Sequence, residues 1–186
     1  MSIAKIVSAT TVAFADLWYA CRDAGGVAAP HKRDLPMRQL APFMSNIALV
    51  SFDETGRAKY ELFGTQLVKM AGVDLTGHYL DSTLDEDARA QRDAGIAEFE
   101  QTAGPDALRA RWSVGTAATT SGRVVQVEDI ALPYFDGTPP EIRHMNFAMV
   151  LGTLEFGEGV TGFFPADELI WFDATGSRPD WLHLKD

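Results

Sequence analysis

The stretch NIALVSFDETGRAKYELFGT, residues 46–65, determines the predicted fold. Residues 46–52 are apolar enough to form a buried central strand, and residues 53–56 carry the composition of a turn. Residues 57–63 then alternate between apolar and polar side chains, which is typical of a strand with one buried face. The stretch therefore predicts a β-hairpin near the start of the domain.

Helical patterns follow the hairpin. Residues 65–71 suit a short helix that Gly72 stops. Thr83 and Glu86 are spaced as a capping box, and the apolar residues that follow mark one face of a longer helix that ends at Gly104. This predicts that the helical segments lie between the second and the third strand.

Three further strands are expected in residues 108–114, 124–134 and 142–154, because apolar and polar residues alternate there and turn signals separate them. Helices that interrupt a sheet after two strands imply an α+β fold, in which one antiparallel sheet carries the helices on one face. The predicted fold is therefore a five-stranded antiparallel sheet with its helices between strands two and three.

The segments on either side of this unit are also apolar. A helix is expected from Thr11 to Asp23, and its stripe of Phe14, Leu17 and Trp18 either packs on a second copy of the chain or covers its own domain. The sequence divides into a helical extension at 1–45, a core domain at 46–156 and an aromatic tail at 157–186. That tail is too apolar to stay in water and is expected to pack on the domain or on a partner.

Composition excludes several classes of partner. The 186 residues include 16 basic and 26 acidic side chains, a formal net charge of −10. This charge repels nucleic acids and anionic membranes, so neither is an expected partner. Residues 13–15 have the small-x-small form of a signal cleavage site, but the apolar helical stripe runs through them, so a cytoplasmic protein is expected.

Five short motifs resemble those of a family of small bacterial proteins built from a single PAS domain. They are WYACR at 18–22, PHKRDLP at 30–36, YELFGT at 60–65, GVDLTG at 72–77 and ALPYFDG at 131–137. The resemblance implies a PAS fold and a sensing or protein-interaction role in bacterial signalling, with a homodimer or a signalling protein as partner. It does not fix a ligand.

Residue types that support chemistry are sparse. The four histidines show no metal-binding spacing, so no metal is expected. The resemblance implies no haem, because residues 84–107 lack the histidine that haem-binding PAS domains place before the third strand, and no flavin, because Cys21 lies outside the reactive-cysteine motif of flavin-binding relatives. No nucleophile motif is present, and a non-catalytic module is predicted. The alternative is a small enzyme or binding protein with a cone-shaped α+β fold of the NTF2-like type, which would use His144 together with Asp129 or Tyr60.

A small ligand is the remaining option, in an apolar pocket formed by Tyr60, Phe99, Trp112, Met145 and Phe147. The alternative, which the same residues favour, is a plain packed core. Alternation along the last strand places His144 and Asn146 on the face opposite to Met145 and Phe147. Because the second pair is more apolar, it is the pair expected to point inward.

Overall fold

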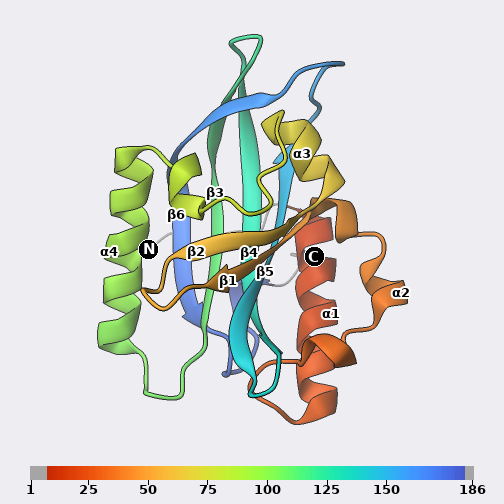
Figure 1. Cartoon of the computed structure of the whole chain (residues 1–186), viewed down its shortest axis with the longest axis vertical. Coiled ribbons are helices and arrows are strands. Elements are labelled where there is room, and N and C mark those ends of the chain that lie inside the picture. Colours follow the sequence, from red (N-terminus) through yellow and green to blue (C-terminus); the bar gives the residue numbers. More distant parts are fainter. Residues whose placement is uncertain (1–7, 183–186) are drawn as a thin grey trace.

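The computed structural model describes residues 8–182, apart from the side chains of residues 162–164. Its strands are β1 (Ile47–Phe52), β2 (Ala58–Phe63), β3 (Arg109–Thr119), β4 (Val124–Asp136), β5 (Glu141–Leu151) and β6 (Val160–Asp173). They form one antiparallel sheet in the order β2-β1-β5-β4-β3-β6, which twists strongly (Figure 1). The α+β class and the placement of helices between β2 and β3 are confirmed.

Four α-helices accompany the sheet: α1 (Ala9–Gly25), α2 (Met37–Leu40), α3 (Thr65–Ala71) and α4 (Glu86–Thr102). Short 3₁₀ turns occur at η1 (Lys32–Asp34), η2 (Met44–Asn46), η3 (Leu80–Thr83) and η4 (Asp180–Leu182). α1 ends at Gly25, two residues beyond the predicted end at Asp23, because Gly26 adopts the left-handed conformation with φ 60°. The capping box is wrong: Asp85 caps α4 by accepting from the amide of Ala88, and the Thr83 hydroxyl donates to Leu80 in η3.

The sheet has one strand more than the five predicted. β6 pairs with β3 from Thr119 opposite Val160 to Arg109 opposite Asp173. The chain then crosses the end of the sheet, where the ring of Trp181 lies 5.7 Å from that of Trp112. The apolar residues of this part of the tail are therefore buried against the chain's own sheet.

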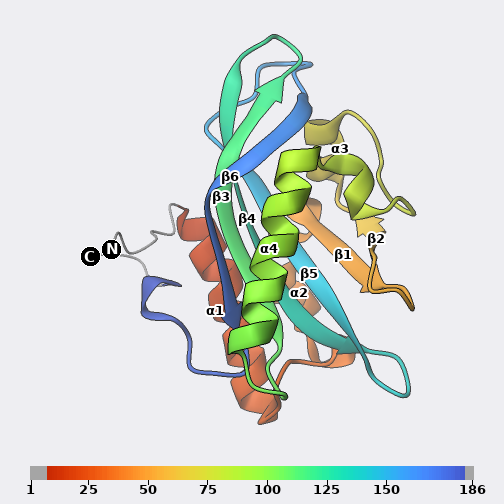
Figure 2. The same ribbon diagram turned by 90° about the vertical axis from the view of Figure 1, so that its left-hand side faces the viewer.

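Both faces of the sheet are covered, as the side view shows (Figure 2). We call the face under α1 and η4 the α1 face; its core includes Phe14, Trp18, Trp112 and Phe147. We call the face under α3, η3 and α4 the α4 face; a second cluster, built around Val50, lies there. Alternate residues of each strand contribute to one core or to the other.

The segment before β1 is fastened to the far end of β4. The indole of Trp18 donates to the carbonyl of Pro133 at 2.8 Å, and the amide of Phe135 donates to the carbonyl of Pro30 at 3.0 Å. Lys32 forms an ion pair with Asp136. The first, second and last of the five sequence motifs thus meet in space and fix α1 on the sheet.

This arrangement decides between the two alternatives for the α1 stripe. Phe14 and Trp18 are almost completely buried, and the ring of Phe14 stacks on that of Phe147 at 5.2 Å. Leu17 is half-buried and lines a hollow between α1 and residues 30–39. The stripe covers its own domain, so Phe14 and Trp18 are not accessible to a second copy in this fold.

Candidate ligand-binding site

A cavity of about 170 Å³ lies between the α4 face of the sheet and the helical segments that cover it. We call it the apolar cavity. Most of its wall is hydrophobic, with side chains from β1, α3, η3, α4 and β6: Ala48, Leu67, Met70, Leu80, Leu84 and Leu169. A largely apolar hollow with a few convergent polar groups is the common form of a small-molecule site.

The polar groups of the apolar cavity come from the strands. Tyr60 of β2 is almost fully buried, and this burial raises the pKa of its hydroxyl, which therefore stays protonated near neutral pH. Asp129 of β4 accepts from the Ser113 hydroxyl and forms an ion pair with Arg111. The amide side chain of Asn146 completes this wall. A ligand here would meet both donors and acceptors.

A second cavity of about 170 Å³ adjoins the first. Four arginines line it, Arg57, Arg92, Arg109 and Arg111, and we call it the arginine cavity. The two cavities share lining residues, among them Leu80 and Asn146. Together they form one continuous candidate site, apolar at one end and cationic at the other.

His144 lies on the wall of the arginine cavity, where it is more than nine-tenths buried. Burial lowers the pKa of its imidazole to about 3, and the positive charges of Arg109 and Arg111 act in the same direction. The imidazole is therefore neutral at physiological pH. The suggested pairing with Asp129 is not formed, because that carboxylate is engaged by Arg111 and Ser113.

The five residues predicted to form a ligand pocket do not lie together. Tyr60 lines the apolar cavity, but Trp112, Met145 and Phe147 are buried on the opposite, α1 face. Phe99 is half-buried on α4 and lines neither cavity. The expectation that the more apolar pair of β5 faces the helical insert is wrong, since that pair packs under α1.

The residues that sequence reasoning missed are mostly charged. Arg109 and Arg111 alternate with buried apolar residues in β3, a pattern that equally describes a strand with one face in solvent. Only the knowledge that α4 covers this face turns the same pattern into a row of guanidinium groups inside the protein. The sequence did not single out Arg92 of α4 either, because more than half of the residues in that helix are charged or polar.

Against this geometry, a protein-family model described as the PAS domain matches residues 6–145, well over half of the chain. The chain belongs to the PAS domain family. Searches of curated proteins and of solved structures found no match. The match begins before α1 and ends within β5, so β6 lies outside it.

Membership of the PAS family makes a sensory or regulatory module the general interpretation of this fold. Across residues 8–182, no helix is long and apolar enough to cross a membrane. Within the same range, no group of three or more His, Cys, Asp or Glu side chains is placed to hold a metal ion. The two adjoining cavities of this PAS domain are therefore its main candidate functional feature.

Proposed function

We propose that this PAS domain is a non-catalytic sensor in bacterial signalling, which binds a small molecule on its α4 face and acts through contact with another protein. The observation that carries the proposal is the apolar cavity, enclosed by the sheet and by the segments between β2 and β3. A ligand there would contact α3, η3 and α4 at once, so its binding would change how these segments pack on the sheet.

The cavity is also connected to β6. The side-chain amide of Gln91 in α4 donates to the carbonyl of Ala166 at 2.9 Å and accepts from the amide of the same residue at 2.8 Å. Gln91 and Ala166 both line the apolar cavity. A ligand that displaces α4 would therefore act directly on the edge strand of the sheet.

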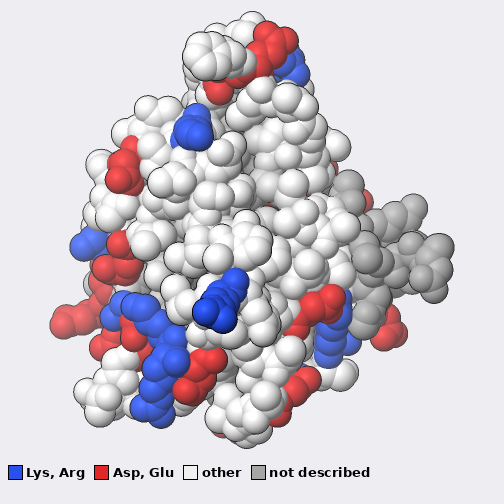
Figure 3. Space-filling model, turned by 90° about the vertical axis from the view of Figure 1, so that its right-hand side faces the viewer, with Lys and Arg blue, Asp and Glu red and all other residues white. Residues whose placement is uncertain are grey.

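A partner surface is available on the side of α1, α2 and α3, where the middle of the molecular surface carries few charges (Figure 3). Met37 of α2 and Val73, just after α3, are both exposed. A second copy or a different signalling protein would bind here without displacing the buried stripe of α1. The homodimer stays part of the proposal on this basis.

Native mass spectrometry of the protein purified from its own cells tests the ligand. The expected result is a bound small molecule that is lost in the Ala148→Leu variant, because Ala148 lines the apolar cavity and a larger side chain fills it. Ala90→Leu is the matched control, since it adds the same atoms at an exposed position of α4.

The same samples test the partner. Light scattering and co-purification are expected to give a different oligomeric state or a different bound protein for Ala148→Leu than for Ala90→Leu. If the wild-type protein carries no small molecule and both variants keep the same partners, the proposed function is wrong.

A further inference from the structure

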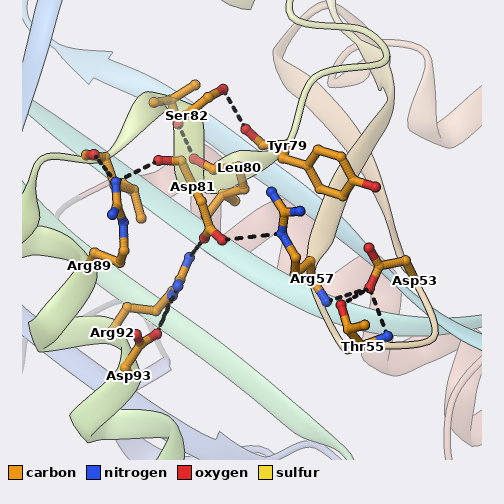
Figure 4. Close-up of polar contacts among 12 residues, drawn as sticks. Asp53, Thr55, Arg57, Tyr79, Leu80, Asp81, Ser82, Arg89, Arg92 and Asp93 are labelled. Atoms are coloured by element: carbon orange, nitrogen blue, oxygen red, sulfur yellow. Dashed lines mark hydrogen bonds and ion pairs between the residues drawn. The ribbon is translucent and has the colours of Figure 1, made fainter.

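The charges around the arginine cavity are incompletely balanced. Asp81 of η3 forms ion pairs with Arg92 and, at 3.9 Å, with Arg57, and Asp93 pairs with Arg92 at 2.8 Å (Figure 4). These contacts join η3 and the β1–β2 turn to α4. The two carboxylates that line the cavity, Asp81 and Asp93, are therefore both engaged by Arg57 and Arg92.

Arg109 and Arg111 stand in a different situation. Arg111 pairs with Asp129 of the neighbouring strand, whereas the nearest carboxylate of Arg109 is that of Glu100, 3.4 Å away and largely exposed. Each of the two guanidinium groups keeps a buried Nε–H that has no hydrogen-bond partner. Burial also lowers the pKa of Arg109, the direction expected for a cation with incomplete compensation.

Two more residues of the cavity hold a buried polar atom in the same state. They are Asn146, through its Oδ1, and Trp171, through its indole Nε1. Eight buried side-chain polar atoms of the described residues have no partner, and four of them belong to residues that line this one cavity. The indole nitrogen of Trp171 packs against Gly95 of α4. The other three atoms, on Arg109, Arg111 and Asn146, are costly to bury without a partner, so their concentration indicates a ligand that would satisfy them.

The ring of Trp171 helps to position two of the four arginines. The ring of Trp171 lies 5.7 Å from the guanidinium carbon of Arg109 and 5.8 Å from that of Arg111. Cation–π contact of this kind limits where the two groups can move. Because His144 is neutral, it adds no further charge. Among the described residues, four arginines and only two carboxylates, Asp81 and Asp93, line the cavity, because the partners of Arg109 and Arg111 lie outside its wall.

We propose that the arginine cavity binds a small organic acid whose carboxylate accepts hydrogen bonds from Arg109 and Arg111. A hydroxyl or N–H group beside that carboxylate would donate to the Oδ1 of Asn146. A carboxylate suits two neighbouring guanidinium groups that each keep an unpaired Nε–H, whereas the dianion of a phosphate monoester would bring a second negative charge near Asp81 and Asp93 and offer Asn146 no donor. This inference rests on the proposed sensory function, for which it names the ligand class.

The test uses three small molecules of almost equal shape. Lactate carries both the carboxylate and the hydroxyl, propionate lacks the hydroxyl, and lactamide lacks the charge. Binding is followed on the full chain by NMR, through the Nε–H resonances of its arginines. Lactate is expected to shift the resonances of Arg109 and Arg111, with propionate weaker and lactamide at least about tenfold weaker than lactate, because hydrogen bonds to a charged group are lost.

Variants locate the site. Arg109→Met keeps an apolar stem of similar length and should weaken lactate binding about tenfold or more. Arg38→Met, at an exposed position outside the cavity, changes the net charge equally and should leave binding unchanged. Equal binding of lactate and lactamide by the wild-type protein would overturn the inference, even if Arg109→Met did not fold.

The outcomes also separate this inference from the proposed function. Ala148→Leu fills only the apolar cavity, so it should exclude a natural ligand that extends into that cavity and still bind lactate, which occupies the arginine cavity alone. A natural ligand that is neutral and apolar, together with no response to lactate, would overturn the organic acid and leave the sensor intact. If the protein binds lactate but carries no natural ligand and shows no change of partner, the organic-acid site stands and the proposed sensory function is overturned.

Discussion

Neighbouring residues of β5 point to opposite faces of the sheet and meet different surroundings. Phe147, on the α1 face, stacks on Phe14 and meets the edge of Phe43, so its ring is surrounded by aromatic carbon. Asn146, on the α4 face, keeps a buried amide oxygen without a partner beside Arg111. The α1 face is packed for stability, and the α4 face retains space and unsatisfied polar groups.

The comparison has an exception on each side. The α1 face buries one carboxylate, Glu128, but the hydroxyl of Thr11 and the indole of Trp112 both donate to it. Burial also raises the pKa of Tyr19 and Tyr134 there to about 12, so their hydroxyls stay protonated, and neither buried hydroxyl has a hydrogen-bond partner within the described part of the chain. The α4 face in turn has a dry cluster around Val50. What separates the faces is the arginine row.

The largest expected effect is on the α1 face. Phe147→Ala should lower the free energy of unfolding by about 3–5 kcal/mol, because it removes a buried ring from a close-packed cluster and leaves a cavity. Urea denaturation followed by circular dichroism measures this. Val124→Ala, at an exposed position of β4, is the control and should change stability little. A loss below about 1 kcal/mol for Phe147→Ala would contradict the assignment of this face as the stable core.

The buried carboxylate provides the next test. Thr11→Val keeps the shape of the side chain but removes one donor to Glu128, and should cost about 1.5–3 kcal/mol. Thr10→Val makes the same change at an exposed position of the same helix. The difference between the two losses of unfolding free energy, measured from the denaturation curves, isolates the hydrogen bond, and equal losses would show that helix propensity alone is responsible.

The sequence predicted the strands of the PAS core well, because alternation and turn residues are local signals. It did not predict β6, where Pro165 and the acidic pair at 167–168 interrupt the pattern. The residues of β3 that pair with β6 lie 41 to 64 residues earlier in the chain, from Thr119 opposite Val160 to Arg109 opposite Asp173. An edge strand of this kind depends on a distant neighbour for its hydrogen bonds. Local patterns therefore carry little information about it.

The candidate site was harder to predict than the fold for a related reason. Alternation sorts β5 into two sets of residues, but it does not say which set faces α1 and which faces α4. When both faces are covered, hydrophobicity no longer decides, and the polar set turned out to line the cavities. Gly64 shows the same limit: its backbone is ordinary, and glycine is required because a Cβ would lie 2.5 Å from the carbonyl oxygen of Ser45.

Acid should weaken the α4 face specifically. The pKa of His144 is about 3 in the folded protein and about 6.5 in the unfolded chain. As the pH falls below 6.5, the unfolded chain therefore takes up a proton while the folded protein does not. The stability contribution is complete above pH 6.5 and declines as the pH falls toward 3, by roughly 1.5 kcal/mol between pH 6.5 and 5. Denaturation at a series of pH values measures it.

The control for this pH dependence is a second histidine. His144→Leu should remove its share of the decline, whereas replacement of the exposed His78 should leave it in place. An unchanged pH profile in His144→Leu would mean that the imidazole takes up a proton as easily in the folded protein as in the unfolded chain, which would contradict its burial beside Arg109 and Arg111.

The smallest expected effect gives the sharpest test of the difference between the two faces of the sheet. Asn146→Leu removes a buried acceptor that has no partner, so stability should change by less than about 1 kcal/mol and rise rather than fall. Asn46→Leu makes the identical substitution where the amide donates to the carbonyl of Ala148 at 2.9 Å, and should lower stability by about 1 kcal/mol. Both are measured on protein dialysed free of small molecules. If both substitutions lowered stability equally, Asn146 would be an ordinary structural amide. The case for a ligand site on the α4 face would then lose its most specific residue.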